Sequence, residues 1–133
     1  EIDGKFLKEI IEMRVSGSRH GLLVSGVEVV YSRKRESYDR ITHLEIGGKP
    51  WQADKIYRVA TTDFLLQGNA GLTMLTKVPE SQVTRYELDL RDVIVDYIKT
   101  NSPLNTEIDN RWKKNDSSKL SESLMKELKR EIN

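Results

Sequence analysis

The residues best suited to chemistry in this sequence lie in a short loop between two apolar runs. Residues 63–75 read DFLLQGNAGLTML, so that Gly68, Asn69 and Gly71 fall between DFLL and LTML. Glycine lets the backbone approach a ligand closely and adopt conformations that other residues avoid. The loop has two glycines, one asparagine amide and no charge between residues 68 and 71. This pattern indicates either a binding loop or only a turn.

The other reactive side chains do not form a recognisable catalytic or metal site. His20 lies in a glycine- and serine-flanked loop and His43 in a predicted strand, and the chain has no cysteine. A zinc site would therefore need distant carboxylates. No serine lies in a nucleophile elbow, and neither glycine-rich phosphate motif is present. Asp89, Asp92 and Asp96 are better explained as acids of a helix start and its solvated face. The residues themselves predict no catalytic residue and no metal ligand.

Composition excludes several classes of partner. The 22 basic and 21 acidic side chains nearly balance, which argues against a nucleic-acid partner. No apolar run approaches the length of about 18 residues that a membrane span needs. Without cysteine, disulfides and thiol chemistry are excluded. The chain opens on Glu rather than Met, so we expect it to be processed or excised, with a targeting segment lost along with the missing part.

Helical periodicity occurs near both ends of the chain. Apolar residues recur at helical spacing within residues 5–15, with Asp3 placed to cap and Gly17 to stop the helix. The clearest helix is predicted at 89–101, where Asp89 can cap an amphipathic pattern. After Trp112 the composition becomes strongly charged, and residues 113–133 are predicted to form a charged helical tail with a narrow leucine stripe.

Between these helices the pattern changes to that of strands. Residues 22–32 and 41–46 are predicted to form a hairpin with a long connection, followed by a turn at 47–51 and a strand at 55–62. Phe64, Leu65 and Tyr57 are predicted core residues. These elements predict an α+β fold, with helices packed on a largely antiparallel sheet. Chain length predicts one domain, drawn at 1–112, with the tail beyond it.

A resemblance to a known family extends this interpretation. EIDGKFLKEIIE, GLLVSGVEVVYS, RITHLEIGGKPWQADKIYRVATTDFLLQGNAG, DLRDVIVDYIKTNSP and DNRW, in this order, resemble the C-terminal domain of the 5'-nucleotidase family. The resemblance covers residues 1 to about 112. It includes only the later part of that domain, because the family's Asn-Gly-Gly-Gly-hydrophobic-Arg segment would lie upstream of Glu1.

The resemblance implies a division of labour between domains. In this family an N-terminal metallophosphatase domain carries a divalent metal pair and attacks the phosphate, while the C-terminal domain grips the nucleoside or sugar. The resemblance therefore implies a hydrolase of nucleotide catabolism, with an extracytoplasmic location that is periplasmic, secreted or surface-anchored. The expected partners are a nucleotide or nucleoside-like small molecule and the N-terminal domain, with no nucleic acid and no membrane span. The chain alone is expected to be inactive.

Of the family's substrate-binding segments, this chain contains the loop at residues 68–72. Against the family's Gly-Gly-Asp-Gly-aromatic, the sequence has Gly68, Asn69, Ala70, Gly71 and Leu72. The resemblance implies that these five residues bind substrate. Ala70 removes the family's carboxylate, Leu72 replaces a ring that stacks on the base, and the acids that follow in the family are replaced by TMLTKVP. Base stacking on a ring is worth about 1–3 kcal/mol.

Two functions of different classes remain open. In the first, the chain is the substrate-recognition domain of a metal-dependent phosphoesterase acting on a nucleotide or related phosphate ester. Asn69 and the backbone of Gly68 and Gly71 would contact the organic part, with Leu72 packing beside it. In the second, it is a non-catalytic binding or interaction module that kept the fold and lost the nucleotide site.

Overall fold

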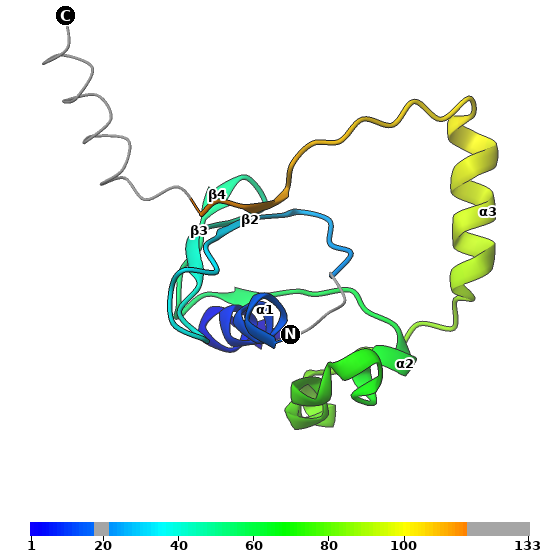
Figure 1. The fold of residues 1–133 in the computed structure, drawn as a ribbon. Coiled ribbons are helices and arrows are strands. Elements are labelled where there is room, and N and C mark those ends of the chain that lie inside the picture. Colours follow the sequence, from blue (N-terminus) through cyan, green and yellow to red (C-terminus); the bar gives the residue numbers. More distant parts are fainter. Residues whose placement is uncertain (18–21, 117–133) are drawn as a thin grey trace, which may run out of the picture. The chain divides into compact units, whose positions relative to one another are not determined.

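The chain is described by a computed structural model over residues 1–17 and 22–116. Figure 1 draws the helices and strands of these residues. The chain divides into two compact units, each built from two stretches. Unit 1 is Glu1–Ile10 with Gln52–Asp109, and unit 2 is Ile11–Trp51 with Asn110–Asn133. The single domain at 1–112 stays a prediction. Of the predicted tail, residues 117–133 lie outside the described part of the chain, as does His20.

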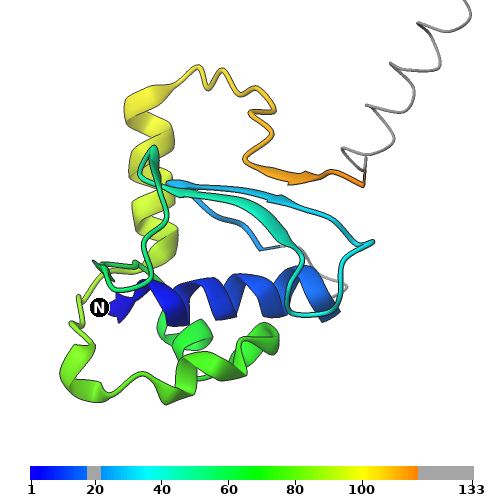
Figure 2. The same ribbon diagram turned by 90° about the vertical axis from the view of Figure 1, so that its left-hand side faces the viewer.

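The first predicted helix is confirmed as α1 (Gly4–Gly17), the blue helix of Figure 2. Its residues contribute to both units. Asp3 acts as the expected cap, because its Oδ1 accepts a hydrogen bond of 2.8 Å from the Phe6 N–H. The helix ends at Gly17, as predicted. Its buried apolar residues are Leu7, Ile10, Ile11 and Val15.

Unit 1 begins with a short antiparallel ladder. Strand β1 (Ile2–Asp3) pairs with β5 (Ile56–Tyr57), so that Ile2 lies opposite Tyr57, and both are buried. The burial of Tyr57 confirms its predicted place in the core. The strand predicted at 55–62 forms a ladder over only two residues, because its partner β1 is only two residues long.

The other regular elements that follow β5 in unit 1 are helices. They are α2 (Asp63–Leu66), the 3-10 helices η1 (Asn69–Gly71), η2 (Thr73–Lys77) and η3 (Glu80–Gln82), and α3 (Leu90–Asn101). The predicted helix at 89–101 is confirmed as α3, and its cap is Asp89, whose Oδ1 accepts a 2.7 Å hydrogen bond from the Arg91 N–H.

Unit 2 contains a four-stranded sheet with the order β4-β3-β2-β6. The predicted hairpin is confirmed, since β2 (Val27–Tyr31) and β3 (Ile41–Ile46) are antiparallel. Strand β4 (Lys49–Pro50) lies within the stretch predicted as a turn at 47–51, of which only Gly47 and Gly48 form the turn, and it pairs with β3. Strand β6 (Trp112–Lys114) adds to β2 in parallel. β6 extends two residues past the boundary drawn at 112. The mixture of helices and largely antiparallel strands confirms the predicted α+β class.

Asp116, two residues beyond the end of β6, holds the turn after β2 through its carboxylate. Asp116 Oδ1 accepts hydrogen bonds from the Arg33 N–H at 2.9 Å and from Ser32 Oγ at 3.3 Å. Its Oδ2 lies 2.9 Å from Lys114 Nζ. The hydrogen bond from Lys114, followed by that from the Arg33 backbone, lowers the pKa of Asp116.

We therefore expect Asp116 to make stability sensitive to acid. A carboxylate whose folded pKa lies below its unfolded value stabilises the fold above the unfolded pKa of about 3.9. That stabilisation is lost as the pH falls through the folded pKa. Urea unfolding at several pH values should show a shallower acid decline for Asp116→Asn than for the unaltered chain. Equal declines would contradict the expectation, and Asp54→Asn, which changes an exposed acid in a turn, is the control.

Candidate functional site

The candidate binding loop, defined as residues 67–72, begins where α2 ends. Thr62 caps α2 through Oγ1, which accepts a hydrogen bond of 3.3 Å from the Leu65 N–H. At the other end the Gly68 N–H donates to Leu65 O at 3.0 Å. Gly68 then adopts left-handed backbone angles, φ 85° and ψ 8°, and turns the chain into η1. The loop is therefore a defined turn between two short helices.

Two features of the structure, the backbone angle and a close contact, each require glycine at position 68. Its positive φ is one that a side chain disfavours, and a Cβ built on it would lie 2.8 Å from Thr76 Cγ2. The same Cβ would lie 3.3 Å from Thr73 Cα. The loop and η2 thus approach each other through the space that a side chain would occupy.

Replacing Gly68 with alanine should destabilise the chain by about 1–3 kcal/mol, because left-handed strain adds to overpacking. Gly48→Ala is the matched control. Gly48 has φ +69°, but a Cβ at this position would meet nothing within 4 Å, so only the strain applies. Chemical unfolding of both variants measures the difference. An equal loss of stability in the two would show that the contact with Thr76 does not matter.

Asn69 fastens the loop to α2. Its Nδ2 donates a hydrogen bond of 2.9 Å to Phe64 O, and its side chain is half-buried. An asparagine amide has a second N–H and an acceptor oxygen besides this bond. Asn69 therefore stabilises the loop through a hydrogen bond that the sequence did not reveal. A ligand would use its second amide hydrogen and its oxygen.

The exposed end of the loop is formed by Ala70 and Gly71. Ala70 has φ 52° and ψ 28°, and Gly71 has φ 75°. A left-handed alanine is uncommon because its Cβ crowds the backbone, at a cost of about 1–2 kcal/mol. Both residues are exposed, so this strained backbone lies at the surface of the loop. Strain of this kind is found at ligand-binding positions.

The burial of Leu72 and Phe64 is the reverse of what the sequence predicts. Leu72, expected to pack beside a ligand, is only 3% exposed and belongs to the core together with Leu75. The prediction that Phe64 is a core residue is wrong, since it is 57% exposed on α2, and Leu65 is half-buried. Alternation and helical spacing cannot decide this over a four-residue helix, where neighbouring side chains point in different directions. The exposed ring beside the loop was thus missed.

Acid–base and metal groups are not gathered at this loop. Over residues 1–17 and 22–116 no group of three or more His, Cys, Asp or Glu side chains is placed to hold a metal ion. The divalent metal pair that the resemblance implies belongs to an N-terminal domain, and it stays an expectation. His43 lies on β3 with its Nε2 3.2 Å from Glu45 Oε1, away from the loop in sequence and in another unit.

Comparison with known proteins identifies the family. The model of the family described as "5'-nucleotidase, C-terminal domain" matches residues 1–77, and the chain belongs to this family. The candidate binding loop lies inside the matched range, whereas α3 lies beyond it.

A solved structure shares the fold. The 5'-nucleotidase precursor from Thermus thermophilus matches with a TM-score of 0.71 and 22% sequence identity. The match covers 88% of this chain and 24% of that chain, so this chain spans about a quarter of that relative's length. No curated protein matches the chain. Within the described residues, no helix combines the length and apolarity needed to cross a bilayer.

Proposed function

We propose that this chain is the substrate-recognition part of a metal-dependent phosphoesterase of the 5'-nucleotidase type. The single observation that carries the proposal is the membership of residues 1–77 in the family of 5'-nucleotidase C-terminal domains. The substrate would be a nucleotide or a related phosphate ester. The candidate binding loop, Gly68, Asn69, Ala70, Gly71 and Leu72, would hold its organic part.

The geometry of the loop supports a role in binding. Ala70 and Gly71 expose left-handed backbone, and Gly68 permits a close approach of chain segments. Asn69 keeps one amide hydrogen and its oxygen for a polar group of a ligand, while its other hydrogen bonds Phe64 O. Leu72 is buried, so it would stabilise the loop by packing in the core and would not contact the ligand.

Catalysis would belong to polypeptide outside this chain. The proposed parent has an N-terminal metallophosphatase domain with a divalent metal pair, which would supply Lewis-acid polarisation of the phosphate and an activated water. The residues of this chain would bind and orient the non-reacting part of the substrate. Binding of that part contributes to catalysis when it positions the reacting group. The proposed location is extracytoplasmic.

A comparison of phosphate release by two polypeptides tests this proposal. One is the 133-residue chain, and the other is the longer polypeptide encoded with its upstream sequence. With a divalent metal and a nucleoside monophosphate, we expect release by the longer polypeptide alone, and its loss on chelation. Release by the 133-residue chain, or none by a folded, metal-loaded longer polypeptide, would contradict the proposal.

A second candidate is a non-catalytic binding or interaction module that kept the fold and lost the nucleotide site. The observation that favours it is the burial of Leu72, which stands where the resemblance implies an exposed ring and leaves neither a ring nor an exposed apolar side chain at that place. The carboxylate of the family is also missing at Ala70. Phosphate release by the longer polypeptide would exclude this candidate, whereas a folded longer polypeptide without nucleoside affinity would support it.

A further inference from the structure

Strand β6 follows α3 after a long connection without regular structure. Residues 102–109 belong to no helix and no strand, and all of them are exposed. The side chains of Leu104 and Ile108 are 46% and 90% exposed, although both are apolar. Exposed segments of this kind are preferred sites of proteolytic cleavage, because a protease binds its substrate as an extended chain. The connection is therefore accessible to an endoprotease.

A second exposed segment, the turn at 33–39 between β2 and β3, differs from the connection because hydrogen bonds hold its backbone. The Tyr38 N–H donates to Ser16 Oγ at 2.7 Å. The Asp39 N–H donates to Glu36 O at 3.1 Å. This turn is exposed but fixed, so it is the internal comparison for the connection.

The backbone of β6 is bound to β2 along its whole length. The two strands are parallel, with Trp112 opposite Val29. The Val29 N–H donates to Arg111 O at 2.7 Å, and the Asn115 N–H donates to Tyr31 O at the same distance. The pairing thus extends one residue beyond β6 at each end.

Side chains add anchors to this pairing. Arg111 Nη1 donates a hydrogen bond of 2.8 Å to Val24 O. The ring centroids of Trp112 and Tyr31 lie 6.3 Å apart, within the range of favourable aromatic pairs. Beyond the strand, Asp116 accepts the hydrogen bonds described above from the turn after β2. All of these contacts are made by residues that follow the connection.

The connection therefore contributes proximity to this binding. A short flexible connection keeps a strand at an effective concentration of about millimolar. An extended peptide that adds to a sheet edge is held by main-chain hydrogen bonds and by side-chain anchors. Residues 111–116 have both kinds of contact with β2 and its neighbouring segments.

We propose that the edge of β2, with the turn that follows it, is a self-contained binding surface for residues 110–116, which stay bound after an endoprotease cuts the connection at 102–109. In this cut, water adds across one peptide bond and leaves a new carboxylate on one piece and a new amine on the other. Cleavage then gives a two-piece protein with β6 in place. The inference rests on unit 2 and is independent of the proposed function.

A single cut in the full chain tests the inference. Residues 103–108 are replaced by the recognition sequence of a sequence-specific endoprotease, and the cut and uncut chains are compared by size-exclusion chromatography with light scattering. At low micromolar concentration, the two pieces should elute together in buffer, at the mass of one uncut chain, and separate in urea. In the unaltered chain, a glutamate-specific endoprotease should cut after Glu107 before it cuts after Glu36 in the turn at 33–39.

Two variants of the cut chain test the anchors. Trp112→Ala removes the ring beside Tyr31 and should raise the dissociation constant of the C-terminal piece about tenfold or more. Lys113→Ala changes an exposed side chain of the same strand and should leave the dissociation constant unchanged. Fluorescence anisotropy of a dye on the C-terminal piece, measured on dilution, gives both values.

Three results would overturn the inference. The first is separation of the pieces in buffer while the uncut variant remains folded, which would show that the connection itself is needed. The second is co-elution at twice the mass of the chain, which would assign the strand bound to β2 to a second copy. The third is an equal dissociation constant for Trp112→Ala and Lys113→Ala. Cleavage after Glu36 ahead of Glu107 would contradict the accessibility of the connection.

Discussion

Replacing Gly4 with alanine is expected to destabilise unit 1 by about 3 kcal/mol, because there is no room for a Cβ at the start of α1. A Cβ on Gly4 would lie 2.0 Å from Gln52 O and 2.9 Å from Tyr57 Cε2. Gln52 O is backbone and Tyr57 is buried, so neither atom can move aside cheaply. The Gly4 N–H also donates a 2.8 Å hydrogen bond to Lys55 O, and displacing the helix would break it. Urea unfolding measures the loss.

Gly17→Ala is the control on the same helix. A Cβ on Gly17 meets nothing within 4 Å, so alanine there should leave stability unchanged or raise it slightly through its higher helix propensity. Equal effects at the two glycines would show that the close approach to Gln52 is not a determinant of the fold.

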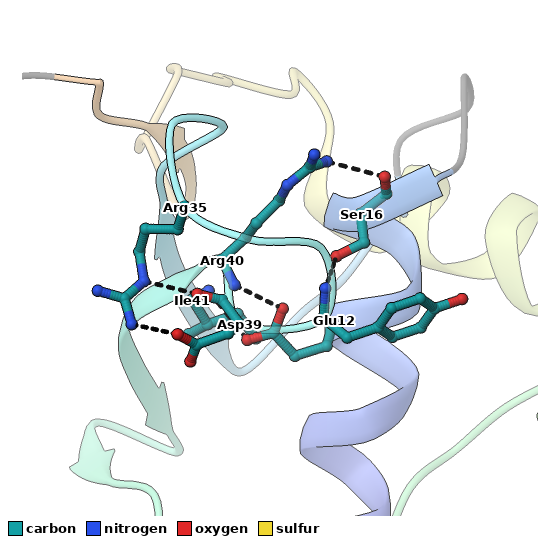
Figure 3. A network of polar contacts seen from close by, with 7 residues as sticks. Glu12, Ser16, Arg35, Asp39, Arg40 and Ile41 are labelled. Atoms are coloured by element: carbon teal, nitrogen blue, oxygen red, sulfur yellow. Dashed lines mark hydrogen bonds and ion pairs between the residues drawn. The ribbon is translucent and has the colours of Figure 1, made fainter.

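Replacing Glu12 with alanine is expected to lower the free energy of unfolding by about 3 kcal/mol. Glu12 is only 4% exposed, and its carboxylate joins α1 to the start of β3 (Figure 3). Oε2 accepts a 2.9 Å hydrogen bond from the Arg40 N–H, and Oε1 accepts one of the same length from the Ile41 N–H. Alanine would leave both backbone donors without their acceptor in a largely buried place.

Two further variants separate this clamp from general effects on the helix. Glu12→Gln keeps one acceptor oxygen, so its loss should lie between zero and that of alanine. Glu9→Ala changes an exposed acid of the same helix and should alter stability by less than about 0.5 kcal/mol. If Glu9→Ala lowers the free energy of unfolding as much as Glu12→Ala, the two hydrogen bonds of the Glu12 carboxylate are not what stabilises the fold. Chemical unfolding of all three variants under one set of conditions provides the comparison.

The Glu12 clamp belongs to a larger network that completes the end of α1. Arg40 Nη1 donates to Ser16 O at 2.8 Å, as Figure 3 shows. It also donates to Val15 O at 3.1 Å, so that it satisfies two carbonyls near the helix end. Ser16 Oγ accepts a 2.7 Å hydrogen bond from the Tyr38 N–H. The connection between β2 and β3 is thereby held to the helix within unit 2.

Local signals in the sequence predicted the regular elements well. Asp3 and Asp89 were recognised as helix caps because a cap acts on backbone groups two or three residues away. The β2–β3 hairpin followed from alternation and turn residues, which are also local. The Glu12 clamp was not foreseen, since its acceptor and donors are 28 and 29 residues apart in the chain.

The candidate binding loop was only partly predictable. The need for glycine at position 68 follows from turn chemistry, but the approach of Thr76 that enforces it is a tertiary contact. Leu72 and Phe64 are both apolar, so composition could not tell which is buried. The left-handed backbone of Ala70 was also hidden, because alanine carries no signal for that conformation.

Calorimetric titration of the longer polypeptide with adenosine and uridine tests most directly whether residues 68–72 hold a nucleoside. We expect saturable heat with at least one nucleoside, binding weakened about tenfold or more in a folded Gly68→Ala variant, and unchanged binding in Gly48→Ala. A folded polypeptide that gives no heat with either nucleoside, or that binds equally well with Gly68→Ala, would contradict a recognition role for this loop.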